Sequence, residues 1–252
     1  MLRAFTRPTG SELLRCELTH LAREPIDLAR AEEQHDAYLD ALRALGTEVY
    51  ELPRLPDHPD AVFVEDTALV LPEVAVILRP GAASRRGETD SVAEALAPHR
   101  EVLRLSDAGT MDGGDLVVLD GTVLVGQSSR TSHPALRELA HLLLPFGYRV
   151  KACGVRGTLH LKSACTAVDE RTLLAHRPWV DLHRAAPERV LDVPPEEPHG
   201  ANVVRVGETL LVSAQAPRTA ERLEQEGYAV RQVDVSEFAK AEGALTCKSL
   251  FF

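Results

Sequence analysis

The chain has 252 residues, of which 44% are hydrophobic and 26% are charged, which is typical of a globular protein and excludes a disordered one. A formal net charge of −10 argues against a nucleic-acid-binding surface and favours a cationic ligand if the acids gather in a cleft. The four cysteines lie far apart without Cys-x-x-Cys spacing, so we expect neither a zinc site nor disulfides, and a reducing compartment is the default.

The N-terminal stretch Met1–Pro8 lacks the apolar run of a signal peptide, and no window approaches 18 apolar residues. We therefore expect a cytoplasmic protein that does not enter a membrane. Within this stretch, Leu2–Thr6 is predicted as a short strand. Asp27 is predicted to cap a helix over residues 28–45, and Glu48–Leu52 is predicted as the next strand.

A unit of strand, turn, strand, polar loop, helix and strand recurs along the rest of the chain, less regularly in its third copy. The four copies cover residues 62–105, 115–152, 161–193 and 201–233. A strong hairpin signal, Asp120-Gly121, marks the second copy. The first strands of the units are predicted at Val62–Leu71, Leu116–Leu119, Leu161–Val168 and Ala201–Val206. Helices are predicted at Asp90–Ala97, Ser132–Gly147 and Thr219–Glu226.

The C-terminal segment Leu245–Phe251 resembles a first strand with no partner after it. It is apolar on both sides of Cys247, so we expect it to be buried. The missing second strand, helix and third strand are at the other end of the chain. Joining the two ends gives a fifth unit, and the predicted fold is one α/β domain over residues 1–252, a closed ring of five units without free sheet edges.

Polar residues mark equivalent ends of the five first strands, which would meet at the centre of such a ring. Five of them follow one another at intervals of 42 to 48 residues. This fairly even period places unlike polar side chains in one pocket. The residues are Glu65, Asp66, Asp112, Asp115, His160, Asn202 and Cys247.

Cys247 and His160 together suggest covalent catalysis. A thiolate is a strong nucleophile, and an imidazole within hydrogen-bond reach can favour the thiolate and later transfer protons. The plain alternative is that Cys247 is an inert buried side chain and His160 a structural one.

The acids favour the catalytic interpretation. Glu65 and Asp66 lie inside an apolar segment, where burial of two carboxylates is costly unless a cation arrives. Asp112 and Asp115 flank two glycines that let a ligand approach the backbone. Three or four carboxylates beside a thiol predict a planar, delocalised cation such as guanidinium, which carboxylates bind by paired hydrogen bonds.

Two arginines in equivalent loops, Arg85 and Arg130, could hold a carboxylate at the far end of the ligand. The alternative is that both are solvated loop residues. A ligand with a guanidinium, a spacer and a carboxylate is similar to arginine.

Five motifs in series now resemble one family. They are Phe63–Asp66, Arg79–Arg86, Met111–Asp115, Leu159–Lys162 and Leu245–Cys247. The chain is identified as a member of the dimethylarginine dimethylaminohydrolases, of the guanidino-group-modifying or pentein superfamily. The resemblance covers nearly the whole chain and implies a five-bladed α/β propeller, closed by pairing of the N- and C-terminal segments.

The resemblance also implies roles at the centre of the propeller. Cys247 would be the nucleophile and His160 the general acid and base. Asp112 would orient that histidine or a substrate nitrogen. Asp66 would bind the guanidinium, with Glu65 as its neighbour in the substrate pocket.

The remaining implied contacts are at the amino-acid end of the substrate. Arg85 and Arg130 would bind the α-carboxylate. Asp60 and the backbone of Leu18 would contact the α-amino group, with Leu18 on a loop that closes the pocket. Ala241 would offer another backbone contact.

The implied reaction is hydrolysis of Nω-methylated L-arginine to L-citrulline and methylamine or dimethylamine, through a covalent thiouronium on Cys247. It needs no metal and no other cofactor, its partner is a small-molecule substrate rather than nucleic acid or membrane, and a homodimer is left open. An arginine deiminase, releasing ammonia, is the alternative, although those enzymes carry an inserted helical region that this chain lacks. A non-catalytic pentein binding protein is an alternative of another class, but such proteins lack the Cys and His that this chain has.

Overall fold

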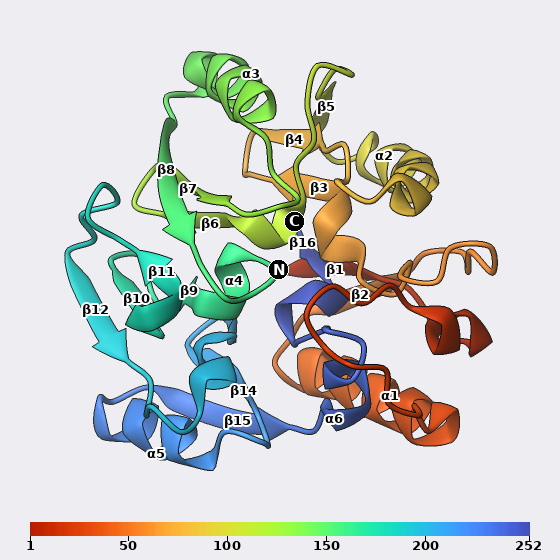
Figure 1. The fold of residues 1–252 in the computed structure, drawn as a ribbon, viewed down its shortest axis with the longest axis vertical. Helices are drawn as coiled ribbons and strands as arrows, with labels where there is room; N and C mark the ends of the chain where they lie inside the picture. The colour runs from red at the N-terminus through yellow and green to blue at the C-terminus, as the bar shows by residue number, and fades with distance from the viewer.

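The computed structural model describes all of residues 1–252 and contains five separate β-sheets with helices around them (Figure 1). The strands, sheet by sheet in hydrogen-bonded order, are β16 (Leu250–Phe251), β1 (Arg3–Thr6) and β2 (Glu48–Glu51); β3 (Ala68–Val70), β4 (Val74–Ile77) and β5 (Glu101–Arg104); β11 (Val180–Asp181), β8 (Arg149–Val155), β7 (Thr122–Gln127) and β6 (Leu116–Leu119); β12 (Arg189–Asp192), β10 (Thr172–Ala175) and β9 (Cys165–Ala167); and β13 (Val204–Val206), β14 (Thr209–Ser213) and β15 (Ala229–Val233).

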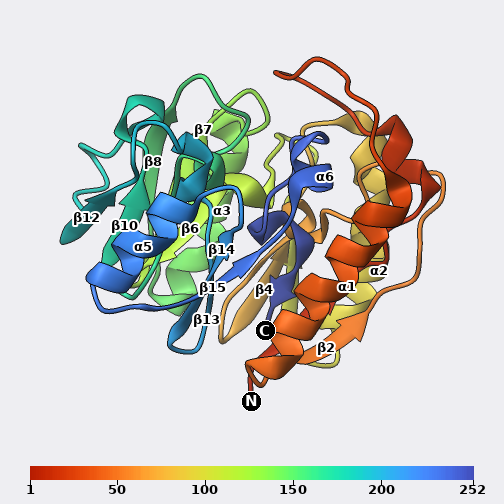
Figure 2. The same cartoon turned by 90° about the horizontal axis from the view of Figure 1, so that it is seen from below.

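The longer helices lie at the periphery of the molecule, outside the sheets (Figures 1 and 2). The α-helices are α1 (Leu28–Ala44), α2 (Thr89–Leu96), α3 (His133–Leu143), α4 (Leu161–Ala164), α5 (Pro217–Gln225) and α6 (Ser236–Ala239). The 3₁₀ helices are η1 (Ser11–Arg15), η2 (Val64–Thr67), η3 (Ala83–Glu88), η4 (Gly113–Asp115), η5 (Leu144–Phe146), η6 (Arg177–Trp179), η7 (Pro198–Ala201) and η8 (Thr246–Lys248). None of these helices combines the length and apolar character needed to span a bilayer.

The predicted repeat is confirmed by the strand pairing. In each sheet a first strand runs antiparallel to the second, and the second runs parallel to the third, as β3, β4 and β5 do. The sheets are therefore mixed. One pairing was not expected: the two-residue strand β11 comes from the third unit but pairs with β8 of the second.

The two ends of the chain pair as predicted. Strand β16 runs antiparallel to β1, with Phe5 opposite Leu250, and β1 runs parallel to β2. The backbones of Arg3 and Phe252 exchange two hydrogen bonds of 3.2 and 2.9 Å. The Phe252 ring stacks on Phe5 with centroids 4.4 Å apart. The apolar tail is thus part of a sheet.

The prediction of a ring without free sheet edges is wrong, because the five sheets are not hydrogen-bonded to one another. The physical reason is the shortness of the first strands. For example, β3 pairs with β4 over only three residues. The rest of each predicted first strand has no ladder partner, so its backbone must find hydrogen bonds within its own segment.

Those bonds are found in single helical turns, which correct four strand predictions. The segments Val62–Leu71, Leu161–Val168, Ala201–Val206 and Leu245–Phe251 contain η2, α4, the end of η7 and η8 respectively, and become extended only afterwards. The strand Leu116–Leu119 is confirmed as β6, and it too follows a turn, η4.

These five turns form the centre of the molecule. Turn η2 contacts η8 and η4, and α4 contacts η4 and η7. Asn202, directly after η7, completes the circuit: its side chain donates to Thr246 Oγ1 of η8 at 3.0 Å and accepts from the Thr246 N–H at 3.1 Å. The polar residues that the sequence places at the hub therefore lie on or beside helical turns, which contact one another directly.

The signals for helix starts and turns are largely confirmed. Asp27 caps α1, its side chain accepting from the Arg30 N–H at 3.1 Å, and Ser132 caps α3. Asp120 and Gly121 both have positive φ, of 45° and 64°, as a two-residue hairpin requires. Helix α5 starts two residues earlier than predicted, at Pro217, a residue suited to the first turn.

Lys248 is an unexpected member of the core. Its side chain is completely buried, and its Nζ has no hydrogen-bond partner. Nζ lies 3.2 Å from the centroid of the Phe238 ring and 5.5 Å from that of Tyr38. Burial lowers the pKa of this amine well below its usual value, because a charged ammonium loses its hydration there.

We predict that Lys248→Met raises the free energy of unfolding at pH 7 by about 1–3 kcal/mol, because it removes a buried group without an acceptor. The folded pKa is below the unfolded one, so the unfolded chain binds more protons between the two values, and the cost of Lys248 falls as the pH rises through that window. Urea denaturation of wild type and variant at pH 7 and pH 10 measures this difference.

The control is Lys151→Met, because Lys151 donates to the Ala185 carbonyl at 3.1 Å and lacks this environment. If the free energy of unfolding of wild type is below that of Lys248→Met by the same amount at both pH values, burial of this amine is not linked to its protonation.

Candidate active site

The predicted nucleophile lies in a small cavity at the hub. Cys247 is the middle residue of η8, is partly buried, and its Sγ accepts from the Ala244 N–H at 3.4 Å. The cavity has a volume of about 30 Å³. Seven of the ten predicted site residues line it: Asp60, Asp66, Arg85, Asp112, Arg130, His160 and Cys247.

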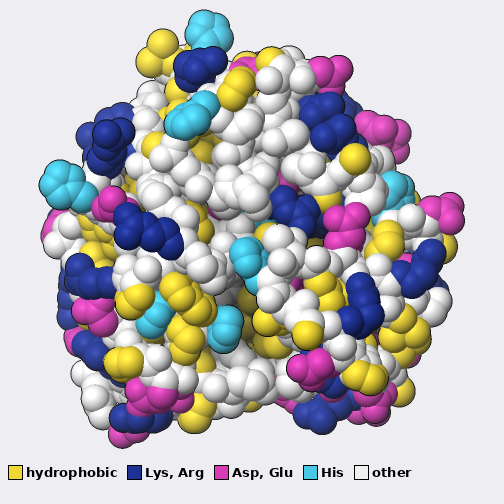
Figure 3. All heavy atoms as spheres, in the orientation of Figure 1, with side chains coloured by type: hydrophobic (Ala, Val, Ile, Leu, Met, Phe, Trp, Pro, Cys, Tyr) yellow, Lys and Arg dark blue, Asp and Glu magenta, His cyan; other side chains and the backbone are white.

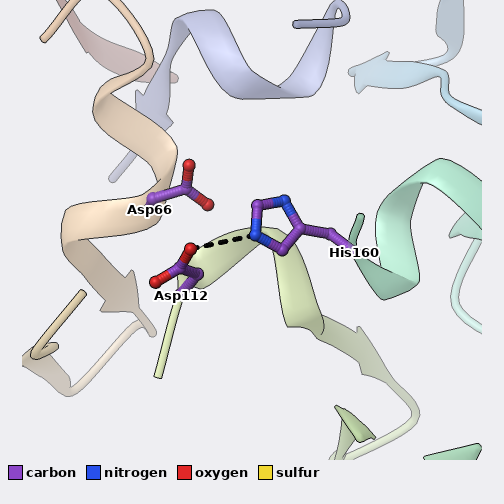
Figure 4. A group of neighbouring side chains, drawn as sticks. All are labelled: Asp66, Asp112 and His160. Atoms are coloured by element: carbon purple, nitrogen blue, oxygen red, sulfur yellow. Dashed lines mark hydrogen bonds and ion pairs between the residues drawn. The ribbon is translucent and has the colours of Figure 1, made fainter. Parts of the chain in front are cut away.

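The imidazole of His160 faces two aspartates from different segments, Asp66 and Asp112 (Figure 4). Its Nε2 lies 3.0 Å from Asp112 Oδ2, while Asp112 Oδ1 accepts from the Gly81 N–H at 2.7 Å. Asp66 Oδ1 accepts from the Gly114 N–H at 2.8 Å. Gly114 lies directly against the imidazole, since a Cβ there would come within 2.6 Å of His160 Nδ1. The absence of a Cβ at position 114 therefore leaves room for the His160 ring.

The charges around the cavity shift its pKa values strongly. Burial alone would lower the pKa of His160, but Asp66, the hydrogen bond to Asp112 and Asp115 outweigh it and raise the value to about 9. Burial raises the pKa of the Cys247 thiol to about 12, and Glu65 and Asp66 add to this rise. At neutral pH the side chains that line the cavity therefore include a neutral thiol and an imidazolium.

Asp66 keeps its charge despite complete burial. Desolvation would raise its pKa, but His160, Arg85 and the Gly114 N–H lower it to about 2. Asp66, Asp112 and His160 offer ligand atoms within 4.8 Å of one another, so by distance alone they could hold a metal ion. Asp66 is, however, already neutralised by Arg85, which leaves a metal less charge to bind.

Arg85 is buried with its guanidinium facing acceptors of the protein itself. It donates to Asp66 at 2.5 Å, to Glu88 at 2.9 and 3.2 Å, and to the carbonyls of Phe63 and Asp60 at 2.7 and 3.2 Å. In this arrangement its single positive charge is shared between two buried carboxylates, those of Asp66 and Glu88. Its role as a carboxylate clamp stays a prediction.

The other end of the cavity lies under the loop that follows η1. Asp60 is buried and accepts from the Glu17 N–H at 3.2 and 3.3 Å. Burial raises the pKa of Asp60 to about 6, although Arg85 and the Glu17 N–H oppose the rise. Arg130 reaches the same loop and donates to Thr19 Oγ1 at 2.9 Å.

Three predicted residues do not line this cavity. Glu65 bonds to Lys162 Nζ at 2.5 Å and Thr246 Oγ1 at 2.7 Å, and it faces a second cavity of about 230 Å³ on the other side of these contacts. Leu18 is partly buried against the core beside the loop, and Ala241 is buried, with its N–H donating to the Phe238 carbonyl.

Five residues that line the cavity were not predicted as site residues: Glu17, Phe63, Leu159, Glu242 and Gly243. Phe63 and Leu159 stand beside Asp66 and His160 in the recognised motifs, so the motif positions could have included them. Glu17 and Glu242 are acids in polar loop sequence, and nothing in that pattern distinguishes them. Figure 3 shows charged side chains of both signs scattered around this face, without one large patch of a single sign.

The comparisons with known proteins agree with this geometry. The family model described as "N,N dimethylarginine dimethylhydrolase, eukaryotic" matches residues 19–174. The N(G),N(G)-dimethylarginine dimethylaminohydrolase of Streptomyces coelicolor is 43% identical over 250 residues, which are 98% of this chain and 96% of the relative.

Two solved structures of the same family superpose on nearly the whole chain. One is the dimethylarginine dimethylaminohydrolase of Pseudomonas aeruginosa, a cysteine-to-serine mutant in complex with citrulline, with a TM-score of 0.93, 32% identity, and coverage of 99% of this chain and 98% of that one. The other is a histidine-to-glycine dimethylarginine dimethylaminohydrolase adduct with S-methyl-L-thiocitrulline, with a TM-score of 0.92, 32% identity and 99% coverage of both chains. By sequence and by structure, this chain belongs to the dimethylarginine dimethylaminohydrolase family.

Proposed function

We propose that this protein hydrolyses Nω-methylated L-arginine to L-citrulline, releasing methylamine or dimethylamine. The observation that carries the proposal is the single buried cavity that joins the Cys247 thiol, the His160 imidazole and two aspartates in a chain of this family. The relatives crystallised with citrulline and with a thiocitrulline adduct support the same substrate class and the use of a cysteine and a histidine.

In the proposed complex the substrate guanidinium lies between Asp66 and Asp112, which would bind its N–H groups. Glu65 would support the guanidinium end of the site through its hydrogen bonds with Lys162 and Thr246. Since the cavity has a volume of only about 30 Å³, we propose that the loop over it moves when a ligand of this size enters.

At the amino-acid end we propose that Arg130 and Arg85 bind the α-carboxylate and that Asp60 and the Leu18 backbone bind the α-ammonium, with Ala241 as a further backbone contact. Arg130 already extends across the cavity to Thr19. Arg85 would have to exchange part of its contact with Asp66 for the ligand, and a guanidinium arriving at Asp66 makes this exchange electrostatically balanced.

The electrostatics suggest how the nucleophile is activated. Burial and two carboxylates raise the pKa of the Cys247 thiol. A bound guanidinium neutralises the same carboxylates and adds a positive charge beside the sulfur, so it lowers the thiol pKa. The substrate itself would thus promote formation of the thiolate, with the thiol proton released to solvent because His160 is already protonated, and without substrate the thiol would be protected from other electrophiles.

The chemistry then proceeds in two halves. The Cys247 thiolate attacks the guanidinium carbon, and His160 donates a proton to the departing alkylamine, which leaves a thiouronium on the sulfur. Neutral His160 next takes a proton from water, which attacks the same carbon. The carbon–sulfur bond breaks, and citrulline and the free thiolate are formed. Asp112 holds the imidazole in place throughout.

We also propose that the fold is a five-bladed α/β propeller and that residues 1–252 act as one cytoplasmic catalytic domain. The circuit of contacts among η2, η4, α4, η7 and η8 supports the five-fold arrangement. The pairing of β1, near the N-terminus, with β16, near the C-terminus, supports closure of the last unit from both ends of the chain.

Cys247→Ser should lower citrulline release from dimethylarginine by about 1,000-fold or more, because it removes the nucleophile. His160→Ala should lower it by at least about 100-fold, because it removes the proton donor. Colorimetric detection of citrulline with monomethyl-, asymmetric dimethyl- and unmodified arginine measures both effects and the substrate preference.

The matched control is Cys153→Ser, because Cys153 is a buried free cysteine on β8, outside the cavity. Near-normal turnover by Cys247→Ser would contradict the covalent mechanism. Turnover of arginine alone by the wild type would replace the proposal with an arginine deiminase.

We further predict that a neutral alkylating reagent, chloroacetamide, modifies Cys247 slowly at pH 7, because the raised pKa keeps the thiol protonated. Its rate should rise about tenfold for each pH unit between pH 7 and pH 10, as the thiolate fraction rises. The cationic analogue chloroacetamidine should react much faster at pH 7. Mass spectrometry of the modified peptide gives both rates, and a free cysteine peptide gives the intrinsic ratio of the two reagents. A chloroacetamide rate that is already constant above pH 7 would show that the thiolate is present at rest.

A further inference from the structure

Glu242 makes a set of contacts that the proposed chemistry does not use. Its carboxylate accepts hydrogen bonds from three consecutive backbone N–H groups, those of Thr19, His20 and Leu21, at 2.5 to 3.0 Å. These donors lie in the stretch between η1 and α1, which has no helix or strand of its own. One charged group therefore holds an otherwise irregular segment at several points.

The segment held in this way, residues 17–21, covers the cavity of Cys247. Its first residue, Glu17, lines the cavity and donates its N–H to Asp60, and Arg130 donates to Thr19 Oγ1. Figure 2 shows the N-terminal loop at the end of the molecule that carries α6, from which the Glu242 loop continues. With this segment in place, the cavity has only about 30 Å³.

The backbone of Glu242 is in an unusual conformation for its side chain. Its φ is +56°, in the left-handed region, which is unfavourable for a residue other than glycine. A glycine at this position would adopt that conformation more easily than a glutamate does. Backbone hydrogen bonds at the end of α6 stabilise this turn, from the Glu242 N–H to the Ala239 carbonyl at 3.1 Å and from the Gly243 N–H to the Phe238 carbonyl at 2.9 Å. The contacts of the Glu242 carboxylate, in contrast, all lie on the covering segment.

The position of Glu242 in the chain links this contact to catalysis. It lies on the short loop between α6 and η8, five residues before Cys247, and it lines the same cavity. The Glu242 carboxylate therefore connects the covering segment to the loop that leads into η8, the turn that carries Cys247.

We propose that Glu242 is a positioning residue that latches residues 17–21 closed over bound substrate and so retains the substrate for attack by Cys247. The kinetic consequence of the latch rests on the proposed function, whereas the hydrogen bonds that define the latch are independent of that function. The carboxylate accepts the three N–H groups when the segment is closed and releases them when substrate enters or citrulline leaves.

Two variants test the latch by hydrogen–deuterium exchange. Glu242→Gly removes the carboxylate and relieves the left-handed strain, so the fold should be at least as stable, while the amides of residues 19–21 should exchange about tenfold faster or more. Glu242→Gln keeps one oxygen acceptor, so its exchange rates at residues 19–21 should lie between those of Glu242→Gly and wild type.

The matched control is Glu197→Gln. The Glu197 carboxylate likewise accepts backbone N–H groups, from Arg218 and Thr219 at 3.0 and 2.7 Å, but it does not line the cavity. This variant should leave exchange at residues 19–21 and turnover unchanged. Unchanged exchange at residues 19–21 in Glu242→Gly would overturn the latch, whatever substrate the enzyme uses.

The kinetic arm uses dimethylarginine and its analogue without the α-amino group. Glu242→Gly should raise KM about tenfold for both substrates and lower kcat less than it raises KM, because retention of substrate is what is lost. An unchanged KM despite faster exchange would remove the positioning role. A penalty confined to the amino-bearing substrate, with unchanged exchange at residues 19–21, would show that Glu242 binds the ligand's ammonium, and the latch would be wrong. The same penalty with faster exchange would support a latch that acts through the Leu18 backbone contact. Failure of wild type to turn over either compound would overturn the proposed function alone, since the exchange result stands independently.

Discussion

Compensation of buried charge at the hub is the constraint on which the rest of this structure depends. Asp66 and Asp112 are almost fully buried, and each is stabilised by a cation or by backbone N–H groups. Removing a partner from such a group would cost several kcal/mol, so the turns that carry these residues cannot shift independently. The same arrangement leaves the thiol of Cys247 with a raised pKa, which suits a site whose substrate supplies the missing positive charge.

Much of this architecture could be predicted from the sequence, because its signals are local or periodic. The caps at Asp27 and Ser132, the hairpin at Asp120-Gly121 and the recurring unit each depend on a few neighbouring residues. The pairing of both chain ends followed from an apolar tail that needed burial. Seven of the ten predicted site residues share one cavity for the same reason: the repeat brings equivalent positions to one place.

What could not be predicted depends on contacts between distant segments. A short apolar run reads as a strand whether or not a partner strand covers it, so the single turns at the hub were missed. The orientation of Glu65 towards Lys162 and a second cavity is set by the turn of η2. The bonds of Arg85 to Asp66 and to two carbonyls, and the contacts of Glu242, join residues at least 19 positions apart in the chain, and no spacing in the sequence marks them.

The pairing of β1 with β16 separates the order of the units in sequence from their order in space. Because Arg3 and Phe252 lie side by side, a short linker could join the ends, and the chain could be reopened at another surface turn, such as Gly207-Glu208. Such a circular permutant would keep every strand pair and would carry its nucleophile in the interior of the sequence. The position of Cys247 near the C-terminus thus depends on where the two chain ends lie on this fold, whereas its position at the hub depends on the fold itself.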